Sequence, residues 1–156
     1  MPTIKAFRMD GLGNKFIIVD RRKDIVNITK EKIIHLGNLE SFHREIGFDQ
    51  IIFIEREIDK AFPITIFNSD GGEVSACGNG SRCVAYLLGK DLNTKEVKLK
   101  TNNRLLNAKI VGDLDVEIAM GKPIFEWNKI PLSKNLDHSN ITLNIEDKIF
   151  TEGFCL

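Results

Sequence analysis

The residues most able to do chemistry lie in the stretch FNSDGGEVSACGNGSRC, which runs from Phe67 to Cys83. Cys77 stands immediately before the glycine-rich segment 78–80 and shortly before the apolar run 84–88. If a helix begins here, its free N–H groups and positive dipole end favour an anion. They would stabilise a thiolate at Cys77 or bind a substrate carboxylate. The same residues fit equally well a buried small thiol beside glycines that only shape a turn.

Three amide side chains stand next to predicted strands. Asn68 ends one strand before the turn SDGGE, Asn14 closes the glycine turn GLGN, and Gln50 begins a strand after GFD. Strand ends often carry ligand contacts, but asparagine is also a common turn former. The sequence alone leaves both interpretations open for these residues.

The other cysteines are interpreted differently from Cys77. Cys83 lies inside the predicted helix and is expected to be a core residue. Arg82 either supports the site or lies on a solvated helix face. The spacing of Cys77 and Cys83 is not the C-x-x-C of redox proteins, so a thiol redox or thiol-binding module is a weaker alternative. The three cysteines, including Cys155, are not clustered with histidines, and no metal site is expected.

Composition excludes several classes of partner. The 22 basic and 22 acidic side chains balance, which argues against nucleic acid or an anionic membrane. No apolar run approaches the roughly 20 residues of a membrane span. The N-terminal segment MPTIKAFRMDG lacks the apolar core of a signal peptide, so a cytoplasmic location is expected.

The elements that must position these residues are mostly strands. Helices are predicted at 29–38, capped by Thr29, and at 80–89, closed by Gly89. The first two strands form a hairpin with the four-residue loop 11–14. Because the loops are short, antiparallel pairing is expected. The predicted fold class is α+β, with mostly antiparallel strands and a central helix. The strands are predicted at 3–9, 15–20, 49–56, 62–70, 96–101, 104–112 and 114–121.

The chain changes character after Gly121. Residues 122–140 read as a connector with prolines and asparagines, and residues 141–156 read as two further strands. We therefore expect one domain over residues 1–121. Residues 122–156 are expected to be a connector and the first strands of an incomplete second domain.

Several motifs together resemble the diaminopimelate epimerase family. MDGLGNKFIIVD is similar to the family's N-terminal signature H-G-L-G-N-D-F, and IGFDQ to its second signature. FNSDGGEVSACGNGSRC is similar to the long signature N-A-D-G-S-E-A-x-x-C-G-N-G-x-R-C, and VEIAMGKPIF resembles the strand that closes the family's first domain. Their order and spacing agree over essentially the whole chain.

The resemblance implies an isomerase that interconverts LL- and meso-2,6-diaminoheptanedioate for lysine and peptidoglycan synthesis, without pyridoxal phosphate, metal or nucleotide. Two similar domains would each contribute one cysteine, on opposite faces of the α-carbon. Position by position, Cys77 matches the catalytic cysteine of the first domain. Gly78 and Asn79 match residues that hold the substrate, and substrate-contacting side chains are matched by Asn14, Gln50 and Asn68.

The match also has departures. Asp10 stands where the family usually has histidine, Lys15 where it has aspartate, and TNN at 101–103 where T-x-A-G is common. The C-G-T-G motif with the second catalytic cysteine is not in this sequence, and Cys155 lacks that context. The chain alone, as a fragment, a split-enzyme half or a remnant, is therefore expected to catalyse little or no epimerisation. Its expected partner is a missing C-terminal domain or a second copy. Another cofactor-independent amino-acid racemase of the same fold is the alternative.

Overall fold

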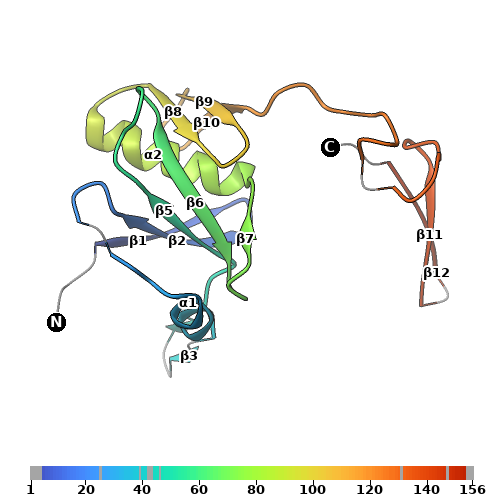
Figure 1. Ribbon diagram of the computed structural model, residues 1–156, viewed down its shortest axis with the longest axis horizontal. Helices are drawn as coiled ribbons and strands as arrows, with labels where there is room; N and C mark the ends of the chain where they lie inside the picture. The colour runs from blue at the N-terminus through green and yellow to red at the C-terminus, as the bar shows by residue number, and fades with distance from the viewer. Residues whose placement is uncertain are drawn as a thin grey trace. The chain divides into compact units, whose positions relative to one another are not determined.

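The computed structural model describes residues 5–24, 26–38, 40–41, 44–45, 47–130, 132–146 and 148–153. These residues belong to two compact units, residues 1–120 and 121–156 (Figure 1). The helices are α1 (Lys30–Gly37) and α2 (Gly78–Leu92). The first unit also contains the strands β1 (Ala6–Gly11), β2 (Asn14–Asp20), β3 (Glu40–Ser41), β4 (Arg44–Glu45), β5 (Gln50–Ile54), β6 (Phe62–Asn68), β7 (Glu73–Val74), β8 (Glu96–Lys100), β9 (Leu105–Ile110) and β10 (Val116–Ala119).

The sheet of the first unit has the order β1-β2-β5-β6-β8-β9-β10, with β7 paired to β6. The mostly antiparallel α+β fold that was predicted is confirmed. Two neighbouring pairs, β2–β5 and β6–β8, are parallel instead. Each is joined by a connection that contains a helix, because a parallel pair needs a long crossover. The short loops that predicted antiparallel pairing join the other neighbours. The two-residue strands β3, β4 and β7 were not predicted.

The hairpin of β1 and β2 is confirmed, but its loop is shorter than predicted. Pairing continues to Gly11 opposite Asn14, so only Leu12 and Gly13 form the loop. Both have positive φ, 49° and 89°, as a two-residue hairpin turn requires. Asn14 is therefore the first residue of β2 rather than part of the turn.

Helix α2 is longer than predicted. It passes through Gly89 and ends at Leu92, and Asn93 takes the left-handed conformation at the C-cap. Gly89 serves a different purpose. A Cβ there would lie 2.6 Å from Ile110 Cδ1 and 2.9 Å from the Thr94 carbonyl oxygen, so glycine is needed for close packing on β9. The prediction for α1 was correct, including the Thr29 cap, whose side chain accepts from the Lys32 N–H.

The two helices lie on opposite sides of the sheet (Figure 1). Successive side chains of a strand point to opposite faces of the sheet, so each face carries its own buried apolar cluster. The smaller cluster lies on the α1 side and contains Val19, Ile33, Phe48, Ile51 and Phe53. The larger lies on the α2 side and includes Phe16, Ile18, Ile52, Ile64, Ile66, Val84, Ala85 and Leu88. The sheet face that carries Phe16 and Ile52 is thus the face that α2 covers.

The first turn of α2 packs against this face through a glycine. A Cβ added to Gly80 would lie 2.6 Å from Ile52 Cδ1, 3.2 Å from Phe16 Cε1 and 3.6 Å from the sulfur of Cys77. Ile52 and Phe16 are fully buried, so neither side chain has room to give way. The absence of a side chain at Gly80 allows the helix to begin directly over β2 and β5.

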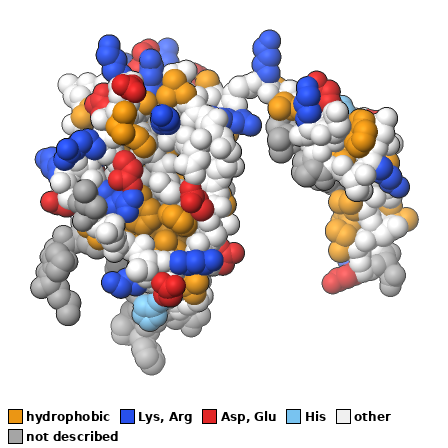
Figure 2. Space-filling model, viewed as in Figure 1, with side chains coloured by type: hydrophobic (Ala, Val, Ile, Leu, Met, Phe, Trp, Pro, Cys, Tyr) orange, Lys and Arg blue, Asp and Glu red, His pale blue; other side chains and the backbone are white. Residues whose placement is uncertain are grey.

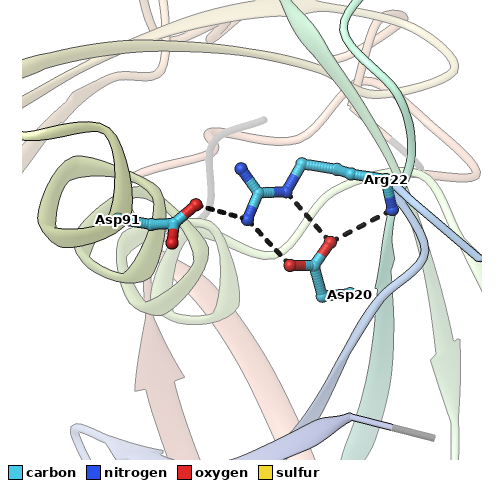
Figure 3. A network of polar contacts seen from close by, with 3 residues as sticks. All are labelled: Asp20, Arg22 and Asp91. Carbon is cyan, nitrogen blue, oxygen red and sulfur yellow. Dashed lines mark hydrogen bonds and ion pairs between the residues drawn. The ribbon is translucent and has the colours of Figure 1, made fainter.

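The other end of α2 is tied to the sheet by an ion-pair network (Figure 3). Arg22 follows β2 and donates to both carboxylate oxygens of Asp20, from Nε at 2.9 Å and from Nη2 at 2.7 Å. The same Nη2 lies 2.7 Å from the carboxylate of Asp91, in the last turn of α2. The Arg22 guanidinium lowers the pKa of the Asp20 carboxyl.

The second unit contains two strands, as predicted, β11 (Ile141–Ile145) and β12 (Lys148–Glu152), which pair as a hairpin. Ile130 and Ile141 are buried. Exposed apolar side chains on this hairpin are Ile145, Ile149 and Phe150. Figure 2 shows hydrophobic side chains at the surface of this unit.

We predict that Arg22→Ala lowers the free energy of unfolding by about 1–2 kcal/mol at pH 7, because charge-assisted hydrogen bonds are lost from a partly exposed site.

The pKa of Asp20 is lower in the folded chain than in the unfolded one. Its stabilisation is therefore complete above pH about 4 and is lost as pH falls below that value. Urea unfolding of the wild type and Asp20→Asn should show a difference that narrows between pH 7 and pH 3. An equal difference at both pH values would contradict this.

We predict that Gly80→Ala destabilises the fold, whereas Gly78→Ala does not. Alanine gains up to about 1 kcal/mol over glycine in a helix. Overpacking against Ile52 and Phe16 costs about 1–3 kcal/mol and outweighs this gain. At Gly78 the nearest atom to an added Cβ is the sulfur of Met120, at 3.8 Å, which is an ordinary contact. Thermal unfolding followed by circular dichroism should give a lower Tm for the first variant alone. Equal Tm values would show that the first turn can shift without cost.

Candidate active site

Cys77 occupies the N-cap of α2, as the sequence predicted. Its backbone is extended, with φ −148° and ψ 109°, and the helix begins at Gly78. Its sulfur accepts from the Gly80 N–H at 3.4 Å, and its carbonyl accepts from the Ser81 N–H at 2.9 Å. The side chain is half-buried. In a helix, the N–H groups of Gly78 and Asn79 have no intrahelical acceptor, so they are placed to bind an anion beside the sulfur.

Asn14, Gln50 and Asn68 come together at one end of the sheet. They lie on the adjacent strands β2, β5 and β6, with Gln50 opposite both Phe16 and Asn68 in register. Because side chains alternate along a strand, Asn14 shares a face with Phe16, and Gln50 shares a face with Ile52. This is the face that α2 covers, at the end where α2 begins. The Gln50 Nε2 donates to Asn68 Oδ1 at 3.0 Å.

A second chain of hydrogen bonds reaches the same place from α2. Arg82 donates to Asn79 Oδ1, and Asn79 Nδ2 donates to Asn14 Oδ1 at 2.8 Å. Asn14 Nδ2 donates to the Asp49 carboxylate at 3.3 Å. The backbone N–H of Lys15 donates to the same carboxylate oxygen at 2.8 Å. The four predicted amide side chains thus form two hydrogen-bonded pairs, Asn79 with Asn14 and Gln50 with Asn68, and the strands β2 and β5 that carry Asn14 and Gln50 are neighbours.

Two residues of this network were not assigned by sequence reasoning. The sequence does not assign a role to Arg82, and it presents Asp49 only as part of the motif IGFDQ. The spacing of Asn79 and Arg82, three apart on a helix, was a usable signal because such residues share a face. For Asp49 no local signal existed, because its contact with Asn14 depends on the parallel pairing of β2 and β5.

The side-chain oxygen Oε1 of Gln50 is buried and has no hydrogen-bond partner among the described residues. Buried polar atoms are ordinarily paired, so an unpaired acceptor at this end of the sheet marks a position for a ligand donor such as an ammonium group. The described residues contain no cluster of His, Cys, Asp and Glu able to hold a metal ion.

Cys83 lies in the core, as expected, with 6% of its surface exposed. Burial raises the pKa of its thiol. A Cβ at Gly11 would lie 3.0 Å from its sulfur, so the β1–β2 hairpin packs directly on it. Cys83 therefore does not share the accessibility of Cys77. Cys155 lies outside the described residues.

The departures Asp10 and Lys15 are directly opposite each other in the β1–β2 hairpin. Opposite charges in such a cross-strand pair are favourable, so the two changes keep a complementary pair at this position. The third departure, at 101–103, begins with the buried Thr101, which pairs with the Arg104 carbonyl oxygen.

Within the described ranges, neither α1, α2 nor any other helix has the length and apolar character of a bilayer-spanning segment.

The fold is similar to those of solved proteins. A hydroxyproline epimerase from Agrobacterium vitis, solved with bound trans-4-OH-L-proline, superposes with a TM-score of 0.55 over 92% of this chain and 45% of its own, at 13% identity. A phenazine biosynthesis PhzC/PhzF protein from Clostridium difficile has a TM-score of 0.55 over 71% of this chain and 42% of its own, at 18% identity. Identities this low show a shared fold only.

Sequence comparison is more specific. The diaminopimelate epimerase of Pelagibacter ubique is 45% identical over 93% of this chain and 52% of its own length. That of Acidiphilium cryptum is 38% identical over 87% of this chain and 48% of its own. The chain thus spans about half the length of these curated relatives. A family model described as diaminopimelate epimerase matches residues 6–126. By this match, the chain belongs to the diaminopimelate epimerase family.

Proposed function

We propose that the chain is the N-terminal part of a diaminopimelate epimerase, in which Cys77 removes and returns the α-proton of diaminopimelate. Residues 1–121 would form the domain with this first catalytic cysteine, and residues 122–156 would begin the second domain. The observation that carries the proposal is the position of the Cys77 sulfur at the start of α2, over the strand ends that hold Asn14, Gln50 and Asn68.

The α-proton of an amino acid is very weakly acidic, so its removal needs a positioned base and stabilisation of the carbanion. The Cys77 thiolate takes the proton, and the electron pair of the Cα–H bond moves towards the carboxylate. The N–H groups of Gly78 and Asn79 donate to that carboxylate and stabilise the added charge. Return of the proton from sulfur to the same face restores the starting amino acid.

The amides would hold the rest of the substrate. Each keeps at least one N–H after its described hydrogen bond, and these donors suit a carboxylate. The unpaired Gln50 Oε1 suits an ammonium group. A substrate with an amino and a carboxyl group at each end offers both. In this proposal no cofactor takes part, because the thiol accepts and returns the proton and the N–H groups at the start of α2 stabilise the carbanion.

Inversion requires a second acid on the opposite face of the α-carbon, since one thiol serves one face only. In this proposal the second acid comes from a C-terminal domain, or from a second copy of the chain in a dimer. Apart from this second acid, we propose that the chain binds only its small-molecule substrate and neither nucleic acid nor a membrane. We propose that it acts in the cytoplasm.

We predict that native Cys77 is alkylated faster than Cys83, because Cys83 is buried in the core. The ratio of the alkylation rate with iodoacetate to that with iodoacetamide should be higher at Cys77 than at free cysteine, because the helix N-terminus attracts the carboxylate of iodoacetate. Peptide mapping by mass spectrometry assigns each modified site. An unchanged ratio would mean that no anion site adjoins the sulfur. A reversible Cys77–Cys83 disulfide would instead favour the redox alternative.

We predict that the 156-residue chain exchanges the α-proton of LL-diaminopimelate for deuterium in D₂O but produces little or no meso isomer. Proton NMR follows the loss of the α-signal, and chiral chromatography follows the isomers. Cys77→Ala should abolish exchange, whereas Cys83→Ala, which removes only a core thiol, should retain it if the chain stays folded.

Other outcomes assign the activity differently. Exchange of proline or hydroxyproline without exchange of diaminopimelate would favour another cofactor-independent racemase. Full epimerisation by the purified chain would show that it supplies both acids. A folded chain that exchanges none of these substrates would refute the proposed activity for the chain by itself.

A further inference from the structure

The hydrogen-bond chain Arg82–Asn79–Asn14–Asp49 has a charged group at each end. A guanidinium can only donate hydrogen bonds, and an ionised carboxylate can only accept them. Between these ends stand two amides, each of which can be turned by 180° to exchange its oxygen and nitrogen. The charged ends remove this freedom. Turning Asn79 would set its NH₂ against the donors of Arg82, and turning Asn14 would set its oxygen against the carboxylate of Asp49.

From this polarity we infer that Arg82 and Asp49 are positioning residues, which orient the amides of Asn79 and Asn14 so that one N–H of each stays available to a bound carboxylate. The inference rests on the proposed function for the nature of the ligand. The hydrogen-bond polarity itself follows from the geometry alone. Neither residue is required to touch the substrate.

Both ends of the chain are held in place. Asp49 accepts from Asn14 and also from the backbone N–H of Lys15, so its carboxylate is anchored to the first two residues of β2. Arg82 lies on α2 three residues after Asn79 and is half-buried. It lines a hollow of about 340 Å³ together with Asp10, Tyr86 and Asp115. An arginine side chain carries its charge under all ordinary conditions, and a charged donor bonds an amide oxygen more strongly than a neutral one.

The first experiment measures the amides directly. The side-chain ¹H–¹⁵N signals of Asn79 and Asn14 are assigned in the wild-type chain and compared in Arg82→Met, Arg82→Lys and Arg56→Met. Arg82→Met removes the donor but keeps most of the apolar stem. Lysine can still donate, and Arg56 is an exposed arginine that serves as the matched control. Thermal unfolding confirms that each variant is folded.

We expect the signals of both amides to shift and their solvent exchange to accelerate in Arg82→Met. Arg82→Lys should restore much of the wild-type pattern, and Arg56→Met should leave it unchanged. An Asn14 signal that does not respond to Arg82→Met would overturn the inference, because orientation would not pass along the chain. A merely structural role for Arg82 would lower Tm without the rescue by lysine.

The second experiment measures binding of LL-diaminopimelate by NMR titration. If the wild-type chain binds, Arg82→Met should weaken binding by about tenfold, because Asn79 loses a hydrogen bond to a charged group that orients it. Arg82→Lys should recover part of the affinity. Equal binding by wild type and Arg82→Met would overturn the positioning role. If the wild-type chain does not bind, the proposed function fails for this chain, and the amide signals alone decide whether Arg82 orients Asn79 and Asn14.

Discussion

The close approach of α2 to the sheet at Gly80 is the contact on which the rest of the site depends. An added Cβ would lie only 2.6 Å from Ile52, so any side chain here would push the helix start away from β2 and β5. The electrostatic effect of the helix dipole is confined to the first turn. If the helix start moved away from the sheet, its free N–H groups would no longer lie over the strand ends. The position of the Cys77 sulfur over these strands follows from the same contact.

The helix is held at its two ends by different forces. At its start the constraint is steric and apolar, between Gly80 and fully buried side chains. At its end the constraint is electrostatic, between Asp91 and the Arg22–Asp20 pair. The first acts at any pH, whereas the second weakens as Asp20 is protonated. Packing at Gly80 therefore fixes the start of α2 at every pH. The hold on its other end depends on pH.

The polar part of the site is organised by two charged side chains and by strand register. Asp49 and Arg82 give direction to amides that have none by themselves, and β-strand register brings Gln50 and Asn68 into line beside them. Charge pairing also explains how the hairpin accommodates Asp10 and Lys15. They are cross-strand neighbours, so the two changes leave opposite charges facing each other.

The sequence by itself determined the helix that begins after Cys77, because a capping residue, a glycine run and an apolar run are all local. It also determined the longer strands, but not the two-residue strands β3, β4 and β7. The family motifs are contiguous in the sequence. Only the tertiary structure decided that Asn14, Gln50 and Asn68 lie side by side, because they are distant in the chain and meet through strand register. The parallel pairing of β2 with β5 and the contact of Asp49 with Asn14 were decided in the same way. Such contacts depend on which crossover packs on which face, and no local pattern records that choice.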